Sequence, residues 1–327
     1  MRCGFVSLVG RPNTGKSTLM NSILGMKLAI TSDKAGTTRN IINGIYNDDD
    51  SQIVFVDTPG IAKPSHKLNN LLNKKAYTNT EGVDVILFLI DIYKGFGKGD
   101  QFILNRIKDK DVPIFLLLNK IDKVEDKTKL LKNINELKEL CDFKEIIPLS
   151  AKSHENVDTV INCIKPYLSE MDRIYSEDEL TNVSTRFIMA ELVREKVLEL
   201  TKDEIPHSVT CYVESFEEED NLVRIQVLIV VDRDNLKKII IGKRGSMLKE
   251  IGMRARYDME KFLGKKVYLS TYVKTLKNWR DQEKYFQELG LEEDGIVNSE
   301  LWEFLLSSTE VSFYSDVNNP TLKLGDS

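Results

Sequence analysis

Residues 10–17 have the types and spacing needed to hold the phosphates of a nucleotide. They read Gly-Arg-Pro-Asn-Thr-Gly-Lys-Ser and fit the pattern G-x-x-x-x-G-K-[ST]. In such a loop the backbone N–H groups surround the phosphates, Lys16 offsets their charge and the Ser17 hydroxyl binds Mg²⁺. An apolar run precedes the loop and the helix-like run 18–24 follows it, which is the context that the pattern needs. The predicted phosphate-binding residues are Gly10, Arg11, Pro12, Asn13, Thr14, Gly15, Lys16, Ser17 and Thr18.

A second motif, further along the chain, indicates which base the nucleotide carries. Asn119-Lys120-Ile121-Asp122 fits the pattern N-K-x-D. The Asp122 carboxylate can accept hydrogen bonds from both N–H donors of guanine, whereas adenine lacks that pair and would leave the carboxylate without partners. A short segment after a later apolar strand, residues 150–152, would close over the edge of the base. The predicted guanine-binding residues are Asn119, Lys120, Asp122, Ser150, Ala151 and Lys152.

Two more segments are predicted to respond to the γ-phosphate. The switch II candidate, which follows an apolar strand, consists of Asp57, Thr58, Pro59, Gly60 and Ile61. Its aspartate suits a water-mediated Mg²⁺ contact, and its glycine can offer a backbone N–H to the γ-phosphate.

The switch I candidates are Thr37 and Thr38, in the loop 31–39. A threonine there would bind Mg²⁺ only while the γ-phosphate is present, so that the loop orders with GTP and relaxes after hydrolysis. The alternative is that both threonines are turn or cap residues. The predicted Mg²⁺ ligands are Ser17, Thr38 and Asp57.

The first 168 residues alternate apolar strand-like runs with helix-like stretches. This alternation predicts an α/β fold, a P-loop domain with a mostly parallel sheet and helices on both faces, whose ligands bind at the carboxyl ends of the strands. A further strand at 41–46 is expected to be antiparallel at an edge. The other predicted strands are 4–9, 53–56, 85–90, 114–118 and 145–148.

The polar and acidic residues 169–182 are the predicted linker between this domain, 1–168, and a second one, 183–290. The second domain reads helix (184–201), two strands (208–216 and 222–231), helix, Gly-Lys-Arg-Gly, helix (246–262) and strand (266–274). A G-x-x-G loop between two helices, as at Gly242–Gly245, is how a KH domain clamps single-stranded nucleic acid. The alternative is an ordinary helix–turn–helix.

The distribution of charge supports a nucleic-acid site in this second domain. The whole chain of 327 residues has a formal net charge of −5. From Arg233 to Lys284, 15 Lys and Arg stand against 6 Asp and Glu, an excess of +9, so the rest of the chain sums to −14. A confined basic segment in an acidic protein indicates one site for a polyanion.

Other features of the sequence exclude several classes of protein. The cysteines, Cys3, Cys141, Cys163 and Cys211, form no C-x-x-C pair and have no metal-type spacing with the three histidines, so we expect free thiols in a reducing compartment. The longest apolar runs are too short to span a bilayer. We expect a cytoplasmic protein, with any membrane contact limited to peripheral association at the inner face of the cell membrane.

The motifs of the first domain resemble the Era-type branch of the translation-factor-related GTPases. The resemblance implies that Asn13 is tied to a potassium ion beside the phosphates. It also implies that the residue after D-x-x-G is apolar, here Ile61, in place of the glutamine of Ras-like enzymes. Water would then be held by backbone groups, with potassium in the place of an arginine finger, and intrinsic turnover would be slow.

The second domain resembles a type II KH domain, which has the element order α-β-β-α-α-β. Together the two resemblances imply a monomeric GTPase that requires Mg²⁺ and binds the single-stranded 3′ end of small-subunit ribosomal RNA in assembly of the small ribosomal subunit. Trp279 could stack on a base, with a place in the core as its alternative. The predicted RNA-binding residues are Ile241, Gly242, Lys243, Arg244, Gly245, Lys249, Arg254, Lys277 and Trp279.

Two other functions are kept as alternatives: an RNA-binding scaffold whose GTP site barely hydrolyses, and a GTPase that uses its basic segment on a membrane surface.

The chain also departs from the family pattern at its end. Residues 291–327 form an acidic C-terminal extension with 8 acidic residues against one lysine. Within it, 301–306 has the pattern of a short amphipathic helix. The extension is a disordered tail, a segment docked onto its own domain or a contact for a partner. We hypothesise that it shields the basic RNA surface as a pseudo-ligand.

Overall fold

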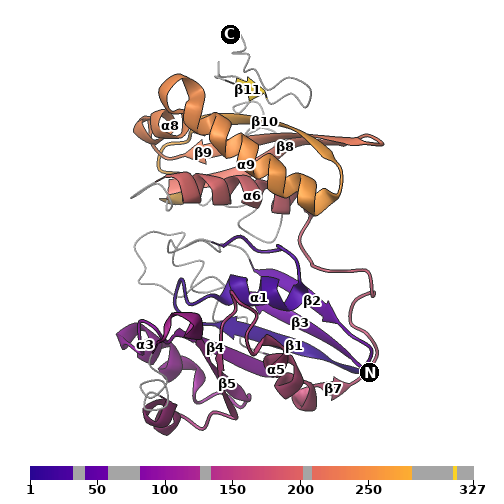
Figure 1. Ribbon diagram of the computed structural model, residues 1–327, viewed down its shortest axis with the longest axis vertical. Helices are drawn as coiled ribbons and strands as arrows, with labels where there is room; N and C mark the ends of the chain where they lie inside the picture. The colour runs from indigo at the N-terminus through magenta and orange to yellow at the C-terminus, as the bar shows by residue number, and fades with distance from the viewer. Residues whose placement is uncertain (32–40, 58–81, 126–133, 202–207, 282–311, 315–327) are drawn as a thin grey trace. The chain divides into compact units, whose positions relative to one another are not determined.

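The computed structural model describes residues 1–31, 41–57, 82–125, 134–201, 208–281 and 312–314 (Figure 1). The described chain forms two compact units, divided between Val183 and Ser184. Each unit is described by itself. The predicted domain bounds of 1–168, 169–182, 183–290 and 291–327 stay a prediction.

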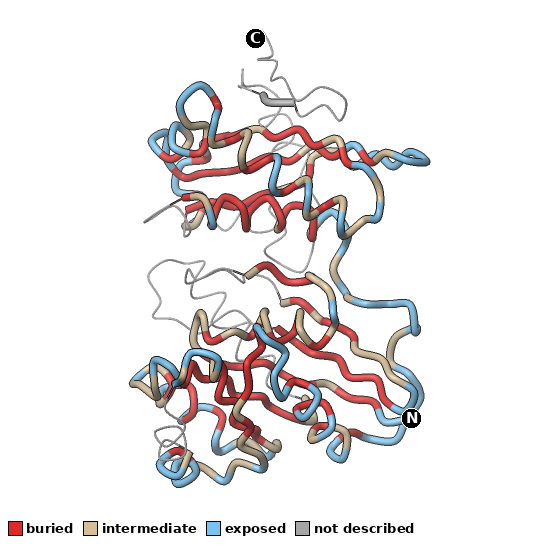
Figure 2. Tube along the Cα trace, viewed as in Figure 1, coloured by how far each residue is buried: buried red, intermediate tan, exposed pale blue. Residues whose placement is uncertain are grey.

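The first unit is built on a sheet in the order β2-β3-β1-β4-β5-β6. β1, β3, β4, β5 and β6 run parallel, and β2 is antiparallel to β3 at the edge, as predicted. Every residue of β3, β4 and β5 is buried, which is typical of parallel strands covered on both faces (Figure 2). The strands are β1 (Arg2–Val9), β2 (Ile42–Asn47), β3 (Ser51–Asp57), β4 (Val85–Asp91), β5 (Ile114–Asn119) and β6 (Glu145–Leu149).

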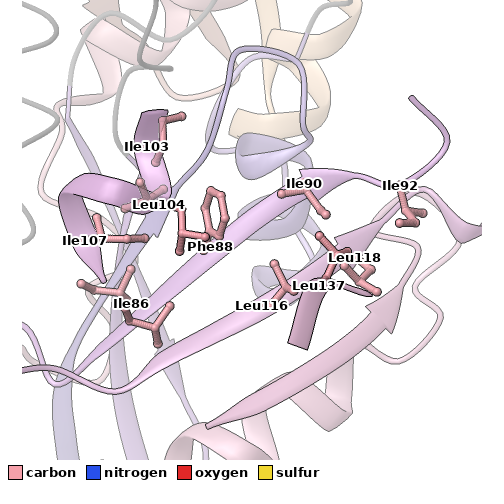
Figure 3. Packing of buried hydrophobic residues seen from close by; sticks show 12 residues of the cluster. Ile86, Phe88, Ile90, Ile92, Ile103, Leu104, Ile107, Leu116, Leu118 and Leu137 are labelled. Atoms are coloured by element: carbon pink, nitrogen blue, oxygen red, sulfur yellow. The ribbon is translucent and has the colours of Figure 1, made fainter. Parts of the chain in front are cut away.

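Helices cover both faces of this sheet. α3 (Lys98–Ile107) buries Ile103, Leu104 and Ile107 against alternate residues of β4 and β5 (Figure 3). Side chains two positions apart share a face of a strand, which is why Phe88 and its neighbours in β4 form one side of this cluster. α1 (Lys16–Leu24) and α5 (Val157–Ile164) pack together on the other face (Figure 1).

The segment predicted as a linker lies along the sheet of the first unit. Its first residues form β7 (Ser169–Glu170), which pairs antiparallel with β1. The buried Gln52 side chain then anchors it: Oε1 accepts from the backbone N–H groups of Ile174 (2.7 Å) and Tyr175 (2.9 Å), and Nε2 donates to Tyr175 O (2.9 Å). The Ile45 N–H donates to Leu180 O at 3.0 Å. The segment is therefore attached to β2 and β3.

The second unit has the predicted element order α-β-β-α-α-β. Its sheet has the order β11-β10-β9-β8, with β8 antiparallel and β10 parallel to β9. α6, α8 and α9 pack against the sheet, and α9 contacts both other helices. The bounds are α6 (Thr185–Leu200), β8 (Val209–Glu218), β9 (Leu222–Val231), α8 (Asp234–Ile241), α9 (Ser246–Leu263), β10 (Lys266–Thr275) and β11 (Ser312–Tyr314).

β11 was not predicted, and it pairs antiparallel with the edge of β10. The amphipathic stretch 301–306 lies outside the described residues. Short 3₁₀ turns cover Ile121–Lys123, Lys138–Leu140, Lys165–Tyr167, Lys243–Gly245 and Trp279–Asp281. Within the described part of the chain, no helix combines the length and the apolar character needed to cross a membrane.

Candidate nucleotide and RNA sites

The backbone of the loop between β1 and α1 has the shape of a phosphate-binding loop. Gly15 caps the amino end of α1 with a φ of 101°, and Asn13 also has a positive φ, of 67°. A Cβ on Gly10 would lie 2.5 Å from the backbone oxygen of Leu89, and a Cβ on Gly15 would collide with the Asn119 side chain. Glycine is therefore needed at both positions, and the N–H groups at the start of α1 are left to face an anion.

Lys16 is buried beneath this loop. Its Nζ donates to the backbone oxygens of Gly10 (3.0 Å) and Arg11 (3.2 Å). Burial lowers the pKa of Lys16 to about 8, although the nearby Asp57 carboxylate acts in the opposite direction. The ammonium group is thus held in place by carbonyl oxygens and has lost most of its water, so an arriving phosphate gains a preformed, poorly screened charge.

Ser17 and Asp57 come together from α1 and the carboxyl end of β3. The Ser17 hydroxyl donates to Asp57 Oδ2 at 2.6 Å, and Asp57 has no exposed surface. A hydroxyl and a carboxylate are hard oxygen donors of the kind that Mg²⁺ prefers, and they lie beside the phosphate loop. The donors in this structure therefore fit a Mg²⁺ ion.

Asn119 links the phosphate loop to the predicted base-binding segments. Its Nδ2 donates to Thr14 O at 2.7 Å. Its Oδ1 accepts from the backbone N–H groups of Lys120 (2.8 Å) and Ala151 (3.0 Å). One buried amide thus joins three loops, and the motif asparagine acts here by holding the site together.

Lys120 and Asp122 occupy the next positions of this motif. Lys120 Nζ donates to Asn13 O at 2.6 Å and to Asp91 Oδ2 at 2.8 Å. Asp122 is exposed, and its Oδ1 accepts from the Ser150 hydroxyl at 2.7 Å. That bond orients a carboxylate which is open to solvent, as a guanine-binding aspartate must be. Lys152 is also exposed.

Two aspartates of this site did not figure in the sequence analysis. Asp91 ends β4 and pairs with Lys120; its signal was available, because a carboxylate at the carboxyl end of a parallel strand is the feature that pointed to Asp57. Asp100 pairs with Arg11, whose Nε donates to Asp100 Oδ1 at 2.7 Å. No local pattern marks Asp100, since its partner is 89 positions away.

Part of the predicted switch machinery cannot be placed. Thr37 and Thr38 of switch I, and Thr58, Pro59, Gly60 and Ile61 of switch II, lie outside the described residues. Their roles stay predictions. Pro12 lies in the loop, and Thr18 lies in the first turn of α1.

The loop between α8 and α9 has a backbone that only glycine adopts readily. Gly242 has φ 74° and ψ 179°, and Gly245 has φ 75° at the amino end of α9. A Cβ on Gly242 would lie 2.8 Å from the backbone nitrogen of Met247. Lys243 and Arg244 are exposed, so the turn presents two cationic side chains on a backbone that a sugar–phosphate can approach closely.

The remaining RNA-binding candidates divide into two groups. Arg254 is exposed on α9, and Ile241 and Lys249 are partly buried next to the loop. Lys277 is exposed and follows β10, at the end of the sheet where α8 begins. The Gly-Lys-Arg-Gly loop lies at the other end of α8, and an eight-residue helix is about 12 Å long. Lys277 is therefore separated from that loop by the length of α8.

Trp279 as a base-stacking residue is a wrong prediction for this structure. Its side chain has no exposed surface, and Nε1 donates to Ser208 O at 3.2 Å. A buried indole with a satisfied N–H belongs to the core, which is the alternative that the sequence also allowed. Among the cysteines, Cys3 and Cys211 are buried and Cys141 and Cys163 are partly exposed, all as free thiols.

Comparisons with known proteins match both domains. A family model described as a 50S ribosome-binding GTPase matches residues 5–120, and a KH domain model matches residues 204–280. A crystal structure of an Aquifex aeolicus Era point variant bound to GDP and AlF4⁻ is 41% identical, with 90% of this chain and 100% of that chain covered and a TM-score of 0.87.

A second solved structure holds Era in complex with MgGDPNP and nucleotides 1506–1542 of 16S ribosomal RNA. It is 40% identical, covers 90% of this chain and 100% of that chain, and has a TM-score of 0.86. Identity at this level over nearly the whole length identifies the family. The chain belongs to the Era family of GTPases, with an amino-terminal P-loop GTPase domain and a carboxyl-terminal KH domain.

Proposed function

We propose that this protein is a GTP-hydrolysing switch that binds the 3′ end of small-subunit ribosomal RNA and acts in assembly of the small ribosomal subunit. The observation that carries the proposal is the presence, on one chain, of a phosphate loop with its buried lysine and a glycine-framed basic turn in a KH domain. The similar Era protein binds MgGDPNP and 16S ribosomal RNA. GTP hydrolysis belongs to the GTPase domain and RNA binding to the KH domain.

In the nucleotide site, the loop N–H groups and Lys16 bind the phosphates, and Ser17 holds Mg²⁺ with Asp57 nearby. Asp122 selects guanine, and the bond from Ser150 keeps its carboxylate oriented. A Mg²⁺ ion held by Ser17 and Asp57 would supply positive charge that offsets the charge developing during phosphoryl transfer. This chain's contribution is to hold those groups in place before the reaction begins.

We also propose a potassium ion beside the phosphates, held by Asn13. The side-chain amide oxygen of Asn13 is the kind of ligand that replaces the hydration shell of K⁺, whereas its backbone oxygen already accepts from Lys120 Nζ at 2.6 Å. The sequence offers Ile61 where a water-positioning glutamine would stand, so backbone groups would hold the water, and the potassium ion would supply the positive charge that an arginine finger gives in other GTPases. The slow intrinsic turnover expected for the chain fits this arrangement.

The test is the rate of GTP hydrolysis in potassium and in sodium buffer, each with and without a short RNA matching the 3′ end of small-subunit ribosomal RNA. Stimulation by RNA in potassium, lost in sodium, supports the whole proposal. Equal rates of hydrolysis in the two buffers would refute the proposed potassium ion. A protein that binds the RNA and GTP but does not hydrolyse GTP is the scaffold that the sequence left as an alternative.

The cytoplasm is the proposed location, because ribosomal subunits are assembled there, and the proposed state is a monomer. A peripheral membrane contact stays a prediction. Flotation of the protein with vesicles containing anionic lipid, compared with vesicles of neutral lipid, tests that contact.

A further inference from the structure

Arg11 is the one arginine of the phosphate loop, and its guanidinium does not face the loop. Its Nε donates to Asp100 Oδ1 at 2.7 Å, and its Nη2 lies 2.7 Å from Asp100 Oδ2. Nη2 also donates to Gly95 O at 3.4 Å. Two parallel charged hydrogen bonds between planar groups fix direction as well as distance.

Asp100 is a rigid partner for this arginine. Its carboxylate has no exposed surface, and Oδ2 also accepts from the Gly97 N–H at 2.9 Å in the first turn of α3. A carboxylate is favoured at this end of a helix. A Cβ on Gly99 would lie 2.6 Å from Arg11 Cδ, so the arginine stem lies directly against a residue without a side chain. α3 itself is fixed to the sheet by its buried face (Figure 3).

The backbone oxygen of Arg11 is a centre of bonding within the loop. It accepts from Lys16 Nζ at 3.2 Å, from the Thr14 hydroxyl at 3.0 Å and from the Thr14 N–H at 3.4 Å. The side chain of Arg11 is therefore anchored to α3, while its carbonyl holds the lysine that meets the phosphates. The two ends of one residue connect α3 to the phosphate site.

We infer that Arg11 and Asp100 form a clamp that sets the conformation of the phosphate loop, with Arg11 as a positioning residue and not as a phosphate ligand. This inference rests on the proposed GTP site and changes the role predicted for Arg11 from the sequence. The clamp holds the loop in its binding shape before nucleotide arrives, so that ordering the loop does not oppose binding. GDP and GTP use the same loop, so the clamp strengthens both complexes equally.

The test is a double-mutant cycle on nucleotide affinity with full-length Arg11→Ala, Asp100→Ala and the double variant. We expect each single variant to weaken GDP and GTP by the same factor, roughly tenfold or more, and the double variant to lose no more than a single one. Arg11→Lys should not restore affinity, because an ammonium lacks the planar fork.

The opposite pattern overturns the inference. If Arg11 bound phosphate directly, Asp100→Ala would release the guanidinium and leave GTP affinity unchanged or stronger, while Arg11→Ala would weaken GTP more than GDP. Asp84→Ala is the matched control, since the Asp84 carboxylate also accepts a backbone N–H (Phe5, 2.8 Å) but lies at the opposite end of β4. Affinity lost equally in this control would mean a general loss of stability, and would also refute the clamp.

This outcome can be separated from failure of the proposed function. If the unaltered protein binds neither GDP nor GTP, the GTP site itself is wrong. If it binds both and Asp100→Ala binds them equally well, only the clamp is refuted.

Discussion

Replacement of Gly242 by alanine should disable the RNA site without affecting the nucleotide site. The residue has φ 74° and ψ 179°, a region of backbone space that residues with a side chain hardly enter. The added methyl carbon would also lie 2.7 Å from Met247 Cβ and 2.8 Å from the Met247 backbone nitrogen. Met247 is the second residue of α9, so its backbone nitrogen is fixed by the helix. It cannot move aside as the end of a flexible side chain could.

The size of the effect follows from these two terms. Holding a non-glycine residue in that region costs about 1–3 kcal/mol, and the clash with α9 adds about 1–3 kcal/mol if nothing moves. The exposed loop can relieve this strain by turning away from its binding shape. We therefore expect RNA affinity to fall by at least about tenfold, while the KH domain stays folded with a reduced unfolding temperature. Gly242→Asp should lose still more, because its carboxylate would stand against the phosphates.

Fluorescence anisotropy with a labelled single-stranded RNA measures the first effect, and GTP binding by the same preparation is the internal reference. Gly252→Ala is the matched control: this glycine lies inside α9, and a Cβ there would meet nothing within 4 Å. Alanine should stabilise the helix at that position by up to about 1 kcal/mol. RNA binding and thermal unfolding of Gly242→Ala that match the unaltered protein would refute the argument.

Four further predictions concern the nucleotide site, the interdomain segment and the carboxyl-terminal extension. Lys16→Met should abolish nucleotide binding, and it should raise the free energy of unfolding of the nucleotide-free protein at pH 7, because it removes a buried charge. Burial lowers the pKa of Lys16 from 10.5 to about 8, so between pH 8 and pH 10.5 the native protein has released this proton while the unfolded chain still holds it. The stability of the parent protein therefore rises with pH over that range. The difference in urea unfolding between the Lys16→Met variant and the parent should become smaller over the same range. Asp122→Asn should weaken GTP by roughly 10–100-fold and reduce preference for guanine over other bases in competition binding; full selectivity would contradict the assignment. Gln52→Leu removes the bonds that hold residues 174 and 175, so we expect a loss of about 3 kcal/mol and faster proteolysis within 169–182, and unchanged cleavage would show that other contacts suffice. Removal of residues 291–327 should tighten RNA binding at low salt and less so at high salt, if the acidic extension shields the basic surface; equal affinity would remove that hypothesis.

Much of the fold could be predicted because its signals are local. The fully apolar strands β4 and β5 and the antiparallel edge strand β2 are where the sequence pattern placed them, within two residues at either end. The order of elements in the KH domain was also read correctly, since helices and strands differ in the period of their apolar residues. β11 escaped prediction, because a three-residue strand has too short a pattern to recognise.

In the candidate sites too, the parts that could be predicted are those with a local sequence signal. The phosphate loop, the N-K-x-D segment and the G-x-x-G turn are contiguous motifs, and their chemistry depends on backbone shape and on residues a few positions apart. The sequence alone therefore determined which ligands this protein is built to bind. The resemblance to the Era-type GTPases rested on the same motifs.

Only the tertiary structure decided which distant partner each side chain has. The guanidinium of Arg11, a residue of the phosphate loop, bonds Asp100. Trp279 was predicted to meet RNA and instead lies in the core with its N–H on Ser208. Gln52 gave no sign of anchoring the interdomain segment, because its partners are 122 and 123 positions away. A long polar or aromatic side chain reaches several neighbours, and only the packing of the whole sheet and its helices determines which one is near enough to bond.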